Sequence, residues 1–182
     1  MKRILAFLTV FLVLTGCSLS DVDNTPTKKV EAFLNNYQTL DQDVLDDLDV
    51  VIAKETSFTN DQREKYRDIL KKHYQNLNYE IKDETINGDK ATVEVEIEVT
   101  DFYKAMEDAD DYLTTNRDDF LDENGIYDEV KYIEYRLGLL EDAKDTVKYT
   151  LNLTLTKNDD GEWVLDDLDD TEEQKILGMY KY

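Results

Sequence analysis

Cysteine, histidine and proline each occur once in this chain of 182 residues, and glycine occurs only six times. A single cysteine cannot form a disulfide within the chain, and a single histidine, His73, excludes metal sites that need two imidazole ligands. The glycines are scattered and form no phosphate-binding loop, and no serine lies in a G-x-S-x-G motif. We therefore expect no cofactor, no metal site and no catalytic residues, which predicts a protein that is not an enzyme.

Basic residues are also few. The chain has 21 lysines and arginines against 43 aspartates and glutamates, which gives a formal charge of −22. Such a chain repels the phosphates of nucleic acid and the headgroups of an anionic membrane. We therefore expect no nucleic-acid partner. The simplest interpretation of the charge is a soluble surface that resists non-specific association.

An apolar segment lies at the N-terminus. After Met1-Lys2-Arg3, residues 4–14 contain no charge and a single polar residue, Thr9. A positively charged start followed by a short apolar run is typical of a secretory signal peptide, and the run is too short to span a bilayer. The segment ends in Leu14-Thr15-Gly16-Cys17, which contains the only cysteine.

These four residues resemble the lipobox of bacterial lipoproteins. The resemblance implies cleavage between Gly16 and Cys17 and acylation of Cys17, whose acyl chains would hold the protein on the membrane. The alternative is a structural cysteine that follows a signal peptide by chance. We expect a signal peptide over 1–16, a lipidated tether over 17–26 and one domain over 27–182. The lysine-rich composition suggests an AT-rich genome and hence a Gram-positive cell, with the protein on the extracytoplasmic face of its membrane.

The pattern of apolar residues predicts three helices after the tether. Pro26 suits the first helical position after a Thr25 cap, residues 41–55 form the second helix, and Thr59 with Gln62 resembles a capping box that starts the third. The residues expected to face inward are Val30, Phe33, Leu34 and Tyr37 in the first helix, Leu45, Leu48 and Ile52 in the second, and Tyr66, Ile69, Leu70, His73, Tyr74 and Leu77 in the third.

Two β-hairpins are expected next. Residues 78–86 and 91–100 flank the turn signal Asn87-Gly88-Asp89, and apolar residues alternate with glutamates along the second strand. The second hairpin joins strands around residues 147–155 and 163–165 through a turn at Asp160-Gly161. Residues 101–145 between the hairpins have a helical pattern, interrupted at Asn124-Gly125. Its expected inward stripe is Ile126, Val130, Ile133, Leu137 and Leu140.

This order of elements predicts an α+β fold in which a curved, four-stranded antiparallel sheet packs on N-terminal helices, with a helical insertion between the hairpins and a short helix after Thr171. The layout resembles cystatin-like and nuclear-transport-factor-2-like domains. That resemblance implies a cavity over the concave face of the sheet. Tyrosine suits such a lining because it packs and forms hydrogen bonds. The candidate lining residues are Tyr37, Tyr66, Tyr74, Tyr79 and Tyr149.

Three functions therefore compete. The first is a non-catalytic binding or interaction module, the second is a small-ligand binder that uses the pocket, and the third is an enzyme. A filled core with an exposed apolar patch would favour the first, and a deep pocket the second. We expect His73 to be a core residue rather than a general base, and Asp160-Gly161 to form a turn rather than part of a calcium loop.

Overall fold

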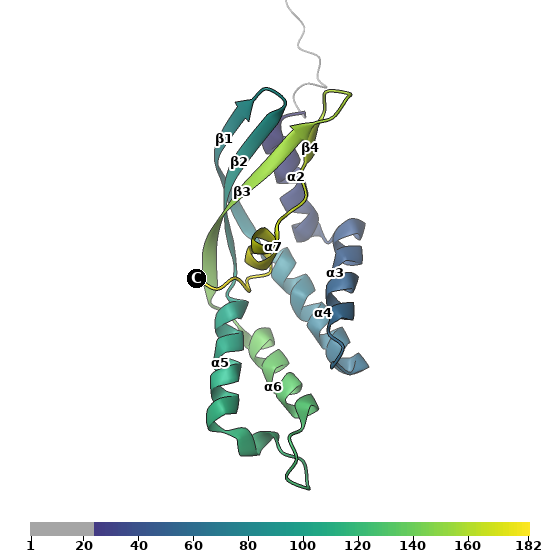
Figure 1. Ribbon diagram of the computed structural model, residues 1–182, viewed down its shortest axis with the longest axis vertical. Helices are drawn as coiled ribbons and strands as arrows, with labels where there is room; N and C mark the ends of the chain where they lie inside the picture. Colours follow the sequence, from purple (N-terminus) through teal and green to yellow (C-terminus); the bar gives the residue numbers. More distant parts are fainter. Residues whose placement is uncertain (1–23) are drawn as a thin grey trace, which may run out of the picture.

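The computed structural model describes residues 24–182 (Figure 1). The predicted signal peptide, its cleavage site at Gly16 and the lipidation site at Cys17 lie outside the described residues. The helices are α2 (Pro26–Thr39), α3 (Gln42–Lys54), α4 (Asn60–Gln75), α5 (Phe102–Thr115), the 3-10 helix η1 (Arg117–Phe120), α6 (Glu129–Asp142) and α7 (Asp170–Ile176). The strands are β1 (Asn78–Asn87), β2 (Lys90–Thr100), β3 (Thr146–Lys157) and β4 (Trp163–Leu165).

The sheet has the predicted antiparallel order β1-β2-β3-β4, so the α+β fold class is confirmed. A two-residue turn at Gly88-Asp89 joins β1 to β2, and Gly88 has a positive φ of 65° that favours glycine. A β-bulge between Ile81 and Asp83 adds one residue to β1, which bends the strand locally. One face of the sheet is apolar and buried, and the other carries the alternating glutamates of β2.

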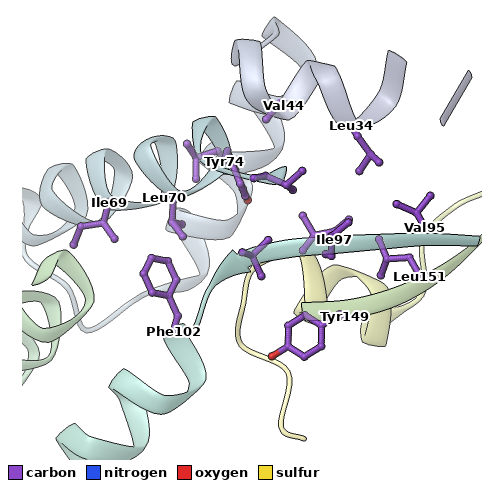
Figure 2. Packing of buried hydrophobic residues seen from close by; sticks show 14 of the residues in the cluster. Leu34, Val44, Ile69, Leu70, Tyr74, Val95, Ile97, Phe102, Tyr149 and Leu151 are labelled. Atoms are coloured by element: carbon purple, nitrogen blue, oxygen red, sulfur yellow. The ribbon is translucent and has the colours of Figure 1, made fainter. Parts of the chain in front are cut away.

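Helices α2 and α4 cover the apolar face of the sheet. Figure 2 shows Leu34 of α2 and Leu70 of α4 on the same side of β2 as Val95 and Ile97. All four residues are 0% exposed, so this interface excludes water. Burial of each such side chain contributes about 1.5–3 kcal/mol. The alternation in β2 and the helical period in α2 and α4 thus meet in one hydrophobic core.

The helix starts follow the predicted chemistry. The Thr25 hydroxyl accepts a hydrogen bond from the backbone N–H of Lys28, and Thr59 with Gln62 forms a complete capping box. Asn24 also belongs to the folded region, since its side chain donates to the carbonyl of Gly161 and accepts from the N–H of Trp163. The last residues of the expected tether, Asn24 to Pro26, are therefore fixed to the domain.

Two details of the helical prediction differ in the structure. In α3, Val44 is buried and Leu45 is only half-buried, a shift of one position around the helix. In the insertion, Ile126 and Val130 are exposed by 64% and 47%, which contradicts the prediction that they face inward. Asp128 caps α6, so Ile126 precedes the helix and Val130 lies in its first turn. The buried residues of α6 begin at Tyr132 and Ile133.

Residues 101–145 form a helical arm of α5, η1 and α6. Figure 1 shows this arm projecting beyond one end of the sheet, whereas the start of α2 and the turn between β3 and β4 lie at the other end. The arm has its own small cluster of buried residues, Ala109, Phe120 and Tyr132. The tip of the arm and the start of α2 therefore lie at opposite ends of the long axis.

Candidate functional site

The five tyrosines predicted to line a pocket do not surround a common cavity. Tyr66 packs edge-on against another aromatic ring near the start of α4. The Tyr79 hydroxyl donates to Oδ1 of Asn35 at 2.9 Å, and the Tyr149 hydroxyl donates to the carbonyl of Tyr180 at 2.9 Å. These three side chains therefore have structural partners. They do not share one lining.

The reason is that the apolar face of the sheet is already filled. Val93 and Val95 of β2 and Leu151 and Leu153 of β3 are each 0% exposed under the helices. Protein interiors pack at nearly crystalline density, so such a face leaves no room for a ligand. The cavity that the fold resemblance implied over this face is filled by core side chains.

Tyr37 and Tyr74 do meet at one site. Their rings pack edge to face with centroids 5.0 Å apart, and Phe33 packs in the same way on Tyr37 at 5.3 Å. These rings border a groove of about 460 Å³ between α3 and the chain that leads from β4 into α7. We call this the α3–α7 groove; it is lined by Phe33, Tyr37, Val44, Asp47, Val50, Val51, Lys54, Tyr74, Leu165, Asp166, Asp167, Leu168, Glu173, Ile176 and Leu177.

Two phenolic hydroxyls in this groove have no hydrogen-bond partner within residues 24–182. Tyr74 is only 5% exposed, yet its hydroxyl and that of Tyr37 make no hydrogen bond to the described protein. Neither oxygen belongs to the fully enclosed polar atoms, so both are accessible from the groove. Because both oxygens are accessible and no described protein group occupies them, a ligand in the groove would form hydrogen bonds with them in place of water.

Carboxylates set the electrostatics of the groove. Burial, together with the charges of Asp47 and Glu173, raises the pKa of Tyr37 to about 12. Burial also raises the pKa of Tyr74, with smaller contributions from the same two carboxylates. Both phenols are therefore neutral at physiological pH. Among the groove-lining residues Lys54 is the only cation, against four carboxylates.

The arrangement suits a ligand with an apolar body and a positive charge. Ligand sites commonly occupy 300–1,000 Å³ and combine an apolar lining with a few placed polar groups, as this groove does. The side chains of Val50, Leu165 and Leu168 offer apolar surface. Asp47 and Glu173 would attract an ammonium group, which could also donate a hydrogen bond to a phenolic oxygen.

The sequence pattern did not predict most of the residues that line the α3–α7 groove. Val50 is 57% exposed on α3, and nothing in the helical pattern distinguishes it from an ordinary surface valine. Leu168 and Glu173 come from a segment more than a hundred residues away in the chain. The clustering of tyrosines was the only available signal, and it identified Tyr37 and Tyr74.

His73 occupies the predicted core position and is 2% exposed. Its Nε2 atom donates to the carbonyl of Ile176 at 2.8 Å, and its ring stacks on Phe102 with centroids 4.6 Å apart. Burial lowers the pKa of His73 to about 4, so the ring is neutral. No nucleophile forms a hydrogen bond with it among the described residues. These contacts support a packing role.

Neither a group of metal ligands nor a membrane-spanning helix is found within residues 24–182. No group of three or more potential ligands is arranged for a metal ion within residues 24–182. The Asp160-Gly161 pair forms the expected turn, in which Oδ1 of Asn158 accepts from the N–H groups of Asp160 and Glu162. In the part of the chain that the structure describes, none of the helices combines the length and the apolar character that a membrane span requires.

Comparison with known proteins gives one structural neighbour of low similarity. No family model matches the sequence, and no curated protein matches it. The fold is similar to that of a candidate lipoprotein, YcdA, from Bacillus subtilis, with a TM-score of 0.41 and 14% identity. The match covers 89% of this chain and 54% of that one, so this chain spans about half the length of the neighbour. The resemblance to cystatin-like and nuclear-transport-factor-2-like domains stays a prediction.

Proposed function

We propose that this protein is a lipoprotein on the extracytoplasmic face of a cell membrane and acts there as a non-catalytic binding module. The anchor in this proposal is Cys17 within the Leu14-Thr15-Gly16-Cys17 motif. The acidic charge of the chain repels anionic lipid, so the acyl chains alone hold the protein at the membrane.

The observation that carries the binding function is the pair of accessible, unpartnered hydroxyls of Tyr37 and Tyr74 in the α3–α7 groove. We infer that the groove binds small organic cations with an apolar body. The filled core beneath the helices disfavours a ligand over the sheet. This assignment therefore moves the ligand site from the face of the sheet to the groove between α3 and the β4–α7 segment.

A pair of probes with a similar apolar body and opposite charges tests this ligand class. We would titrate the full chain, held in nanodiscs of neutral lipid, with 4-phenylbutylamine and with 4-phenylbutanoate, and subtract the signal of empty nanodiscs. We expect saturable binding of the amine and at least about tenfold weaker binding of the acid, because the carboxylates of Asp47 and Glu173 repel it. Equal binding of both probes would show that the carboxylates of Asp47 and Glu173 do not select a cationic ligand, and would contradict the proposed ligand class.

Two matched variants then locate the site. Val50→Arg places a competing cation in the groove, whereas Val164→Arg places the same side chain on β4 outside it, and the two valines are similarly exposed at 57% and 50%. We expect at least about tenfold weaker amine binding for Val50→Arg and no change for Val164→Arg. If both variants bind the amine like the wild type, the groove is not the site.

The anchor has its own test. Cys17→Ala should block acylation, so that the protein is released into the medium or accumulates as precursor, whereas wild type stays with the membrane. Incorporation of labelled palmitate into the variant at the wild-type level would contradict lipidation at Cys17. This result would leave the groove assignment intact.

A further inference from the structure

The tip of the helical arm exposes Ile126 and Val130, which the helical pattern would place in a core, together with the neighbouring Tyr127. Ile126 is 64% exposed, Val130 47% and Tyr127 37%. All three lie within five consecutive residues, at the end of the apolar stripe that continues along α6 into the buried Ile133 and Leu137. The stripe thus extends past the core into solvent, where it has no cover within the described chain.

The tip is held in this shape by a network of hydrogen bonds. Oδ1 of Asp122 accepts from the N–H groups of Asn124 and Ile126, both at 2.8 Å, and the N–H of Asp122 donates to the carbonyl of Ile126 at 2.7 Å. Oδ1 of Asp128 accepts from the N–H of Val130 at 3.0 Å. The exposed position of Ile126 therefore belongs to a fixed turn, and a surface ordered before binding loses little entropy on binding.

Carboxylates without ion pairs surround this apolar surface. Residues 118–129 include six acidic residues and no basic one. Within residues 24–182, none of these six forms a salt bridge. The two cations nearest in sequence have local contacts: Arg117 lies over the Tyr127 ring at 5.9 Å, and Nζ of Lys131 donates to the carbonyl of Leu121 at 2.6 Å.

This combination selects one class of partner. An anionic membrane surface is repelled by the six carboxylates, and a second copy of the chain would bring an equally acidic tip against the first. A partner with alternating basic and apolar residues would match both properties of the tip. We propose that the tip of the arm docks a basic, amphipathic segment of another protein. The surface is separate from the α3–α7 groove, and Figure 1 places it at the opposite end of the molecule from the start of α2.

Designed peptides of one length separate the two contributions to this docking. We would measure the binding of a labelled 18-residue leucine–lysine peptide, patterned as an amphipathic helix, to the full chain in neutral-lipid nanodiscs, with empty nanodiscs as background. The comparison peptides replace every leucine by serine or every lysine by glutamate. We expect the leucine–lysine peptide to bind at least about tenfold more tightly than either comparison peptide, because each of these lacks one of the two contributions. Equal binding of the serine–lysine peptide would show diffuse charge attraction only and would overturn the proposal.

Variants at exposed positions locate the binding surface. The double variant Ile126→Ser with Val130→Ser should weaken binding of the leucine–lysine peptide by at least about tenfold. The matched control, Ile86→Ser with Val164→Ser, removes two side chains exposed by 52% and 50% elsewhere and should leave binding unchanged. Thermal unfolding checks that both variants fold. If the arm variant binds like the wild type, or if the control loses as much affinity, the tip is not the docking surface. Val50→Arg should not affect peptide binding, so this test is independent of the groove.

Discussion

The body of the molecule and its helical arm are built on very different amounts of buried surface. The main core contains 27 buried hydrophobic residues: 22 belong to the body, and five, Phe102, Ala105, Ile133, Leu137 and Leu140, come from the parts of α5 and α6 that pack against it. The cluster specific to the arm contains three, Ala109, Phe120 and Tyr132, supported by half-buried aromatic and aliphatic side chains. Local stability follows buried apolar contact, so the arm should open at lower free energy than the body. The same contrast extends to recognition, with a recessed groove in the body and exposed apolar side chains at the arm tip.

The largest change in the free energy of unfolding should come from a substitution at Gly178, where the C-terminal segment packs against the body. Gly178 has a φ of +67°, and a Cβ atom there would lie 2.1 Å from the carbonyl oxygen of Thr100 and 3.1 Å from Cε1 of His73. Backbone atoms cannot move aside cheaply. We therefore expect Gly178→Ala to lower the free energy of unfolding by more than about 4 kcal/mol, measured by denaturant titration.

The matched change in the arm is Gly138→Ala. Gly138 lies within α6, and an added Cβ atom would meet no atom within 4 Å. Alanine favours a helix interior over glycine, so this variant should be more stable by about 0.5–1 kcal/mol. Equal losses of stability in both variants would contradict the packing of the C-terminal segment against Thr100.

The second effect concerns the arm alone. Phe120 is 4% exposed and packs edge-on against Tyr132 with centroids 5.5 Å apart. Phe120→Ala should lower the local stability of the arm by about 3 kcal/mol, because it leaves a cavity in a very small cluster. Hydrogen exchange should show lost protection in α5 and α6 and unchanged protection in β2 and β3. Simultaneous loss in all four elements would show that arm and body unfold as one unit.

The third effect is a pH dependence that belongs to the body. Burial lowers the pKa of His73 to about 4 from its ordinary value near 6.5, so the unfolded chain takes up the proton first as pH falls. His73 should therefore reduce the stability of the wild type by about 2 kcal/mol between about pH 7 and pH 5. The variant His73→Gln should be less stable by about 1 kcal/mol at neutral pH and should lack this component of the pH dependence. A constant difference between the two proteins over this range would contradict the buried neutral ring.

The smallest effect concerns the acidic start of α3. Asp41 caps this helix and Asp49 pairs with Arg67, so the cluster is partly neutralised without a metal ion. Helical backbone does not wrap a cation, so we expect only loose, screening-type binding. Calcium chloride and sodium chloride at equal ionic strength should raise the melting temperature to nearly the same extent. Saturable calcium binding at micromolar concentration in calorimetry would contradict this.

Local patterns predicted the body well because one face of each element is buried there. The alternation in β2 gave the buried Val93, Val95 and Ile97, and the capping box at Thr59 gave the start of α4. His73 was placed correctly in the core because it lies on the apolar face of the same helix. These signals depend on residues near in sequence.

Sequence patterns could not predict the exposure of the arm tip or the position of the groove. The stripe that contains Ile126 and Val130 reports an apolar face, but periodicity does not say whether the fold covers that face. The groove arises because the segment around Leu168 packs near α3, a contact between distant parts of the chain. A mismatch between pattern and burial at Ile126 is itself informative, since locally inconsistent sites are often functional.

The most direct test of the account is to map where an apolar cation binds. We would record amide chemical shifts of the isotopically labelled full chain in neutral-lipid nanodiscs while adding 4-phenylbutylamine. The account predicts saturable shifts concentrated around Tyr37, Val50 and Leu168, which lie on α2, α3 and the segment between β4 and α7 along the α3–α7 groove. Shifts confined to the arm, or spread evenly over acidic surface residues without saturation, would contradict it.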